Sequence, residues 1–397
     1  NELVGALGWF EISRTHPKRY LANYKKLNAT IKRGLLETNP SASWWPSSPS
    51  LGHDNYGDGW HDDSSGDMHY WSVWHEGKSF DNYRQVKPGF CSEFGFQSFP
   101  SMNVVRQFAS ENDLNIGSPV MESHQKNEGG NARITETMFR YFRFPEGFEN
   151  FVYLSQVQQG LAIKTAVDYW RSLKPRCMGT LYWQLNDTWP VASWSSLNYG
   201  GDWKAMHFMA KRFFQPVNVM IIPEGDELKI IAVNDTMSTA ILDVKLTLIA
   251  LDGTQTDLRE LSGEVCTECG ELLTTLSTDL VPDDHILALT FTSDNGMSGE
   301  DHHTNLPYKS LDLADPELTF STRITKDGVV ITLDVQAPAF YVTLEAEIAG
   351  RFSDNCFLML PNQPREILFT PSENDFSAAA NSIIVRDLFN CSRRKTL

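Results

Sequence analysis

One stretch of apolar residues ends in a carboxylate, and this pattern restricts the possible folds more than any other feature of the chain. Phe90 and Cys91 suit a buried strand, and Glu93 follows where that strand ends. Gly95 and Pro100 allow the backbone to turn away soon afterwards. Because burying an unpaired carboxylate costs free energy, Glu93 is predicted either to form an ion pair or to take part in chemistry.

A second apolar stretch ends in similar polar and aromatic residues. Residues 178–186 predict a strand that carries Trp183 near its end, and Asn186 and Asp187 follow. The other elements predicted in this part of the chain are a helix beginning at Pro17, a strand at 68–74, and helices at 148–173 and 203–214. Alternating strands and helices are typical of a parallel α/β unit.

Three segments carry a resemblance to a known family. They read GDMHYWSVWHEGKSF at 66–80, CSEFGFQSFPS at 91–101 and GTLYWQLNDTWPVASWSSLNYGGDWK at 179–204. These segments resemble the second half of the catalytic barrel of family 2 glycoside hydrolases, and specifically the β-mannosidases of filamentous fungi. The resemblance covers residues 1–215 and, more weakly, residues 352–361.

The resemblance assigns two catalytic carboxylates. Glu93 matches the family's nucleophile, which ends the seventh strand of the barrel. The family's acid/base is the Glu of an Asn-Glu pair that ends the fourth strand, and Asn1-Glu2 matches it, with Glu2 91 positions (93 − 2) before Glu93. Without this spacing and the flanking sequence, Asn1-Glu2 would be interpreted as a disordered tail.

Contacts with a sugar are also implied by the resemblance. Asn1 is expected to hydrogen-bond the sugar 2-hydroxyl, Trp183 to form the floor of the terminal subsite, and His69 to contact a hydroxyl. The residues expected to bind substrate are Asn1, Trp44, His69, Trp71, Trp183, Asn186 and Asp187. From the residues alone, core packing explains Trp183 and His69 nearly as well, and a polar strand end needs no substrate.

The hydrophobic period changes after Pro216. Val244, Leu246, Leu248 and Ala250 alternate with other residues, as in a half-buried strand, and no helical pattern follows. The predicted fold is therefore multidomain, α/β plus β. Residues 1–215 are expected to form the C-terminal half of a (β/α)8 TIM barrel, and residues 216–305 and 306–397 two immunoglobulin-like β-sandwiches. Because four strands cannot close such a barrel, the missing N-terminal part of the same protein is an expected partner.

Composition excludes several classes of protein. A formal charge of −16 argues against nucleic-acid and anionic-membrane partners, and no apolar run reaches the length of a membrane span. Cys266 and Cys269 form a lone CxxC, and no H-E-x-x-H motif is present, so no metal or other cofactor is expected.

Sequons suggest the compartment. Asn28, Asn234 and Asn390 each begin an Asn-X-Ser/Thr sequon, which makes them predicted glycosylation sites. Asn186 begins a fourth sequon, but it lies in the presumed site and is expected to stay bare. A secreted, extracellular protein is predicted, with a lysosomal or vacuolar protein as the alternative.

The function implied by the resemblance is that of a retaining exo-β-mannosidase. Such an enzyme removes terminal non-reducing β-D-mannose from manno-oligosaccharides or glycoprotein glycans by double displacement, through a covalent glycosyl-enzyme. One alternative is another family 2 exo-glycosidase, an exo-β-glucosaminidase or a β-galactosidase. A second alternative is a noncatalytic carbohydrate-binding protein built from the sandwiches, in which Glu93 would be dispensable.

Overall fold

The computed structural model describes residues 1–57, 59–373 and 375–393, which form two compact units. The first unit contains residues 1–95 and 169–183, and the second contains residues 96–168 and 184–397. In the described ranges, no helix is both long and apolar enough to cross a membrane.

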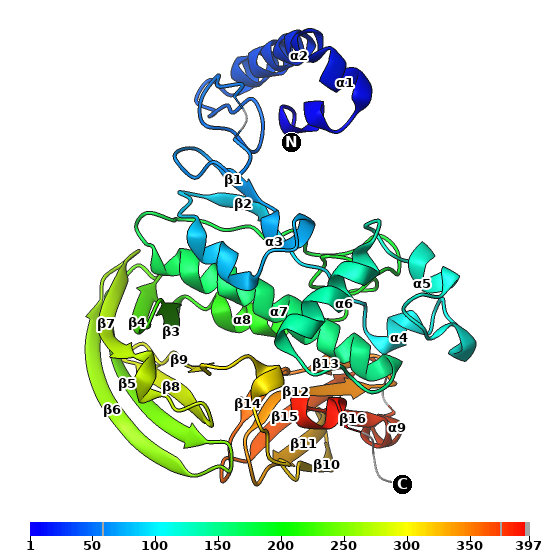
Figure 1. Ribbon diagram of the computed structural model, residues 1–397, viewed down its shortest axis with the longest axis vertical. Coiled ribbons are helices and arrows are strands. Elements are labelled where there is room, and N and C mark those ends of the chain that lie inside the picture. The colour runs from blue at the N-terminus through cyan, green and yellow to red at the C-terminus, as the bar shows by residue number, and fades with distance from the viewer. Residues whose placement is uncertain (58, 374, 394–397) are drawn as a thin grey trace. The chain divides into compact units, whose positions relative to one another are not determined.

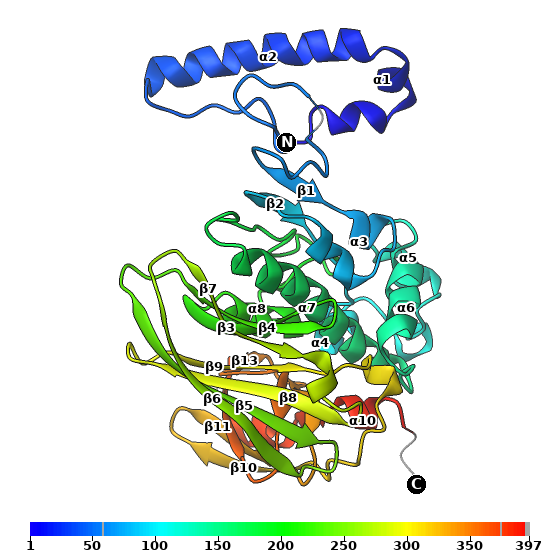
Figure 2. The same cartoon turned by 60° about the vertical axis from the view of Figure 1, so that its left-hand side comes forward.

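The first unit contains a long helix and two short parallel strands (Figure 2). Pro17 starts the long helix α2, as predicted, because its missing N–H and fixed φ suit a first helical turn. The elements of this unit are the 3₁₀ helices Gly5–Gly8 and Phe80–Gln85, α1 (Glu11–Thr15), α2 (Pro17–Thr38), β1 (Met68–Tyr70), α3 (Ser72–His75) and β2 (Cys91–Phe94).

Strand β2 pairs in parallel with β1 on one side and with the segment 178–183 on the other. Leu181 N–H donates to the Cys91 carbonyl at 2.9 Å, and Trp183 N–H donates to the Phe94 carbonyl at 2.8 Å. The segment 178–183 is therefore extended beside β2, but it makes only one regular bridge and not the continuous strand predicted for residues 178–186. The predicted strand 68–74 is also shorter, since α3 begins at Ser72.

An irregularity in the pairing of β1 with β2 determines which side chains face each other. Met68 lies opposite Cys91, whereas the next residue, His69, lies opposite Glu93. Ser92 is thus an extra residue in β2, and such a bulge re-aims the neighbouring side chains. This local geometry brings an imidazole to the strand-end carboxylate.

Helices of the second unit surround α7 (Phe148–Ser172), whose first 21 residues, 148–168, belong to this unit. Apolar side chains such as Val157 and Ile163 are fully buried along it. Its Gln159 amide donates to the carbonyls of Phe96 and Ser195, which ties two loops to the helix. The remaining helices are α4 (Met102–Val105), the 3₁₀ helix Glu111–Asp113, α5 (Pro119–Ser123), α6 (Gly130–Tyr141) and α8 (Ala205–Phe213).

Two antiparallel sheets follow α8 and enclose one apolar core (Figure 1). Their orders are β3-β4-β7 and β6-β5-β8-β9, and side chains of both sheets pack together, as in a sandwich. The strands are β3 (Val217–Glu224), β4 (Glu227–Asn234), β5 (Ala240–Ala250), β6 (Gln255–Val265), β7 (Gly270–Ser277), β8 (His285–Ser293) and β9 (Ser298–His303), with a 3₁₀ helix at Thr278–Leu280.

The predicted alternation in β5 holds only in part. Val244 and Leu246 are buried, but Leu248 is half-exposed and Ile249 is buried in its place. The register of β5 against β6 shifts between Leu246 and Thr247. The extra residue is Leu258 of β6, and the change in the buried positions of β5 lies beside this bulge.

A second pair of sheets follows a 3₁₀ helix at Tyr308–Ser310 and shares another apolar core. The sheet orders are β10-β11-β15-β13 and β14-β12-β16. The elements are β10 (Thr319–Thr325), β11 (Gly328–Asp334), β12 (Ala339–Ala346), β13 (Gly350–Phe352), β14 (Phe357–Met359), β15 (Arg365–Pro371), α9 (Phe376–Asn381), β16 (Ile383–Arg386) and α10 (Leu388–Cys391). Residues 217–303 and 319–371 are thus built mainly from strands, in agreement with the change of hydrophobic period, but the short helices α9 and α10 follow where no helix was predicted.

Candidate active site

Glu93 lies in β2, and its carboxylate accepts hydrogen bonds from two side chains. The Asn1 side-chain amide donates to Glu93 Oε1 at 3.0 Å, and the Trp71 indole donates to the same carboxylate. Cys91 and Phe94 on either side are fully buried and fix the strand in place. The carboxylate is therefore held at the strand end by groups from two distant parts of the sequence.

Glu2 is held beside this strand by the loop at residues 47–50. Its backbone N–H donates to the Ser48 carbonyl at 2.6 Å, and Leu3 N–H donates to Ser47 Oγ at 3.0 Å. Glu2 has a φ of 50°, in the left-handed region that non-glycine residues rarely adopt. Backbone strain of this kind is concentrated at functional sites.

His69 joins the two carboxylates. Its Nδ1 lies 3.0 Å from Glu2 Oε1 and 3.4 Å from Glu93 Oε2. One ligand atom of each of the three residues lies within 4.8 Å of the others, a spacing that could also hold a metal ion. Hydrogen bonds among the three side chains account for the cluster without a metal, and the spacing predicted from the sequence is thus realised as a direct juxtaposition of Glu2 and Glu93.

The protonation of Glu93 reflects opposing influences. Burial, the largest of them, raises its pKa, and the neighbouring Glu2 carboxylate raises it further. The positive charge of His69 and the hydrogen bonds from Asn1 and Trp71 lower the pKa, but the net result is a pKa above the usual range of a glutamate. Such a perturbed carboxylate is typical of a functional site.

The predicted contact between His69 and a sugar hydroxyl is contradicted by burial. The His69 side chain has no exposed surface, and its second ring nitrogen, Nε2, lies 3.1 Å from Ser48 Oγ. Both nitrogens already have partners in the protein, so a substrate hydroxyl has no access to the ring. The described partners of His69 are instead Glu2, Glu93 and Ser48.

Three polar residues behind His69 were not predicted. The hydroxyls of Ser48 and Ser92 each donate to Asp67 Oδ2 at 2.6 Å, and Ser50 N–H donates to Asp67 Oδ1 at 2.7 Å. Asp67 and Ser92 lie within the motifs GDMHYW and CSEFG, and this position could have indicated that they belong to the site. Ser48 had no such signal, because it lies in a proline-rich loop.

The predicted aromatic residues differ in exposure. Trp183 is 41% exposed and could present its ring face to a sugar. Trp71 is 6% exposed and reaches Glu93 through its indole N–H rather than lining an open wall. Trp44 is partly buried, and its carbonyl accepts a hydrogen bond from His53 Nδ1 at 2.7 Å.

Asn186 and Asp187 lie in the second unit and are unlike each other. Asn186 is exposed, but the Asp187 side chain is only 2% exposed and makes an ion pair with Lys126 Nζ at 2.7 Å. The hydroxyls of Ser193 and Ser195 also donate to Asp187. This full set of protein partners contradicts the predicted sugar contact of Asp187, whose role is to hold the loop that follows it.

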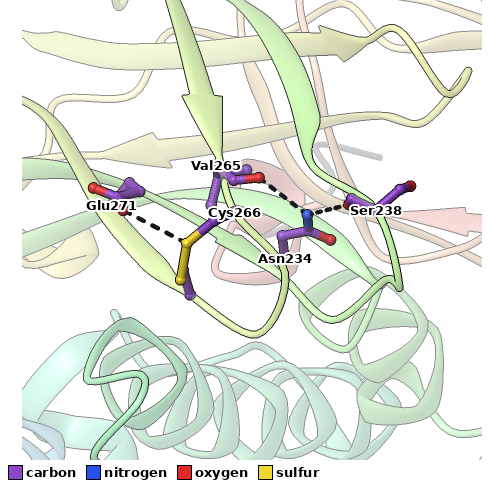
Figure 3. Close-up of a disulfide and its surroundings, with 6 residues drawn as sticks. Asn234, Ser238, Val265, Cys266 and Glu271 are labelled. Carbon is purple, nitrogen blue, oxygen red and sulfur yellow. Dashed lines mark hydrogen bonds between the residues drawn. A yellow bond between two sulfur atoms is a disulfide. The ribbon is translucent and has the colours of Figure 1, made fainter.

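Two predicted glycosylation sites are contradicted by burial. Asn28 is 4% exposed and its amide donates to the Pro46 carbonyl at 2.8 Å. Asn234 is fully buried, and its amide donates to the carbonyls of Ser238 and Val265 (Figure 3). Neither amide has room for a glycan. Asn390 is exposed, and its glycosylation stays a prediction.

The CxxC motif forms a disulfide. Cys266 and Cys269 are joined at the turn between β6 and β7, beside Glu271 (Figure 3). Sulfurs that are bonded to each other are not thiolate ligands, so this oxidised pair is not a zinc site. The other four cysteines, Cys91, Cys177, Cys356 and Cys391, are free and buried.

The chain is similar in sequence to β-mannosidases. A β-mannosidase of the goat Capra hircus is 28% identical over 404 residues, covering 94% of this chain and 46% of its own length. β-Mannosidase A of Aspergillus oryzae is 26% identical and covers 95% of this chain and 48% of its own length. The model of an Ig-fold domain found in mannosidases matches residues 313–391. The chain thus spans about half the length of the relatives that it matches.

Solved structures give a similar result. The β-D-mannosidase of Dictyoglomus thermophilum is 25% identical with a TM-score of 0.80, covering 89% of this chain and 43% of that one. An exo-chitosanase of Amycolatopsis orientalis, 15% identical with a TM-score of 0.59, covers 76% of this chain and 42% of its own and shares the fold.

These matches agree with the resemblance of the sequence motifs to a class of glycoside hydrolases. Within that class, the chain is similar to the β-mannosidases. Because the goat enzyme is at least as similar as the Aspergillus enzyme, the matches do not single out the filamentous-fungal kind.

Proposed function

We propose that this chain forms part of a retaining exo-acting β-mannosidase in which Glu93 is the nucleophile and Glu2 the acid/base. The observation that supports the proposal best is the juxtaposition of the two carboxylates, with one oxygen of each within 4.8 Å of the other. Retaining glycosidases hold their two carboxyl groups about 5–5.5 Å apart, whereas inverting enzymes leave about 6.5–9.5 Å for a water molecule. The short separation favours retention.

The reaction then proceeds in two displacements. Glu93 attacks the anomeric carbon while Glu2 protonates the departing glycosidic oxygen, and the bond from the anomeric carbon to that oxygen breaks. Glu2 next removes a proton from water, which attacks the same carbon and releases Glu93. Asn1, which already donates to Glu93, is placed to bind the sugar 2-hydroxyl, and the exposed Trp183 ring is a candidate floor for the terminal sugar.

The domain organisation is part of the proposal. The parallel arrangement of β1, β2 and the segment 178–183 supports residues 1–215 as the C-terminal half of a (β/α)8 barrel. The remaining residues are proposed to form two immunoglobulin-like sandwiches, 216–305 and 306–397. The partner is the N-terminal part of the same protein, since the relatives are about twice as long as this chain.

A secreted, extracellular enzyme remains our proposal, with a lysosomal or vacuolar one as the alternative. The disulfide between Cys266 and Cys269 supports an oxidising compartment. The substrate class is a terminal β-D-mannoside of manno-oligosaccharides or glycoprotein glycans.

A panel of aryl β-glycosides tests the proposal. The full-length protein is assayed with β-mannoside, β-glucosaminide and β-galactoside, alongside the variant Glu93→Gln. We expect the β-mannoside to have the highest kcat/KM and Glu93→Gln to be inactive on all three. Preference for another glycoside would favour the exo-glucosaminidase or β-galactosidase alternative. No turnover, or undiminished turnover by Glu93→Gln, would contradict the assignment of Glu93.

A further inference from the structure

The hydrogen atoms around His69 can be counted from its contacts. Ser48 and Ser92 each have one hydroxyl hydrogen, and both donate it to Asp67 Oδ2. Ser48 Oγ also lies 3.2 Å from Ser92 Oγ, but its 2.6 Å contact with Asp67 Oδ2 is the shortest that it makes. With its hydrogen directed to Asp67, the Ser48 oxygen, 3.1 Å from His69 Nε2, accepts from the ring. This places a hydrogen on Nε2, which Ser48 and Asp67 hold in a fixed direction.

The other ring nitrogen faces two acidic groups. Nδ1 lies 3.0 Å from Glu2 Oε1 and 3.4 Å from Glu93 Oε2. If Nδ1 and both carboxylates were unprotonated, their lone pairs would repel one another in a site without exposed imidazole surface. A proton between Nδ1 and the closer oxygen, Glu2 Oε1, removes this repulsion.

We propose that His69 is a positioning residue that shares one proton with Glu2 through Nδ1, while Ser48 and Asp67 lock its Nε2–H. The inference rests on the proposed function of Glu2 and Glu93. During the first displacement this proton passes from the Glu2–His69 pair to the leaving oxygen as the glycosidic bond breaks and the Glu93 ester forms. A proton from the attacking water returns to the pair when the ester bond breaks.

Other charged groups do not replace His69 in this role. The groups that contact Glu93 in the first unit are Glu2, His69, the Asn1 side-chain amide and the Trp71 indole, with Asp67 behind Ser48 and Ser92. His69 is the single positive group among these, so its loss leaves the two carboxylates facing each other. An opposite charge within about 4–6 Å lowers a carboxylate pKa by about 1–3 units, so removing it has a measurable effect on the pH profile.

The experiment compares His69→Gln with the parent in the full-length protein, using aryl β-mannosides with good and poor leaving groups. We expect the acidic limb of kcat/KM to move up by about one pH unit. With the poor leaving group, which needs protonation, we expect a loss of at least about 100-fold, and with the good one a clearly smaller loss. An equal loss for both substrates with an unchanged pH profile would mean a merely structural role and overturn the proposal.

The serine relay provides a conservative test. Ser48→Ala should lower turnover of the poor substrate by about tenfold, and Ser48→Thr, which keeps the hydroxyl, should restore it. Ser72→Ala is the control, because Ser72 is a buried serine whose hydroxyl donates to Glu76, outside the site. If Ser48→Ala and Ser48→Thr behaved alike, the relay would be refuted.

A readout without turnover separates this inference from the proposed function. Isotope-labelled histidine NMR of the full-length protein, with His69→Gln for assignment, reports which ring nitrogen carries hydrogen. We expect Nε2 of His69 to carry a hydrogen throughout in the parent protein. In Ser48→Ala we expect Nε2 to carry it for only part of the time. Nε2 without hydrogen would overturn the proposal even if the mannosidase assignment held, and absence of any glycosidase activity would refute only the assignment.

Discussion

Single residues around Glu93 determine when its carboxylate is ionised. Burial and Glu2 raise its pKa, and His69, Asn1 and Trp71 partly offset them. A nucleophile must be ionised to attack, so activity is lost as the pH falls through this pKa. Because the pKa is raised, the loss begins at a higher pH than for an ordinary glutamate.

The first prediction concerns Trp71→Phe, which removes an indole hydrogen bond that lowers the Glu93 pKa. We expect the acidic limb of kcat/KM to move to higher pH, as measured with an aryl β-mannoside in the full-length protein. Trp45→Phe is the control, because the Trp45 ring stacks on His53, whereas the Trp71 indole hydrogen-bonds Glu93. A limb that moved to lower pH would show that the indole does not stabilise the ionised form.

Motif spacing predicted the residues of the site better than their partners. The matching Asn-Glu and Ser-Glu motifs indicated that Glu2 and Glu93 would meet, and they do. The sequence does not show whether a polar side chain at a strand end is buried. His69 and Asp187 were therefore assigned to a substrate, although the fold surrounds both with protein partners.

At the level of elements, the loop after residue 186 depends on one buried charge. Asp187 accepts from Lys126, Ser193 and Ser195. Lys204 is a fully buried lysine near it, and burial lowers the pKa of Lys204 to about 7, against the opposing effect of Asp187. The loop is thus organised by a carboxylate that balances two lysines.

The second prediction is that Asp187→Asn destabilises the protein by about 3 kcal/mol, because it leaves Lys126 without its buried partner. Urea unfolding of the full-length protein measures the change. Asp257→Asn removes an exposed partner of Lys245 and should leave the unfolding transition unchanged. If the two substitutions changed the free energy of unfolding equally, the ion pair of Asp187 would contribute no more to stability than an exposed pair.

The third prediction concerns glycans on the two buried sequons. In a protein expressed through a secretory pathway, we expect peptides with Asn28 and Asn234 to be unmodified, since both amides are buried and hydrogen-bonded to backbone carbonyls. Glycopeptide mass spectrometry measures occupancy, with exposed Asn390 as the site open to modification. A fully occupied Asn234 in active protein would contradict its burial at the end of β4.

Elements with a strong period were predictable, and those shaped by neighbours were not. The long helix predicted at 148–173 is present as α7, because its apolar residues recur over many turns. The strand predicted to end at residue 186 keeps its pairing with β2 only to Trp183, since Gln184 N–H instead donates to the Trp194 carbonyl. The bulge at Leu258 of β6 likewise leaves no pattern in the sequence of its partner β5.

For the whole molecule, the fourth prediction follows from the share of the relatives that this chain covers. The goat β-mannosidase is matched over 46% of its length. If residues 1–215 are half of a barrel, residues 1–397 alone should show no turnover of an aryl β-mannoside above background. Adding the separately expressed N-terminal part should restore some activity. Turnover by residues 1–397 equal to that of the full-length protein would contradict the half-barrel proposal.

The most direct test of the central proposal is the identity of the residue that carries the glycosyl group. A 2-deoxy-2-fluoro-β-mannosyl fluoride slows both displacements, but its good leaving group lets the first proceed, so the ester accumulates. Peptide mass spectrometry of the full-length protein should find the label on Glu93, and Glu2→Ala should still be labelled because fluoride departs without an acid. A label on any other residue, or none in an active enzyme, would contradict the assignment of Glu93 as the nucleophile.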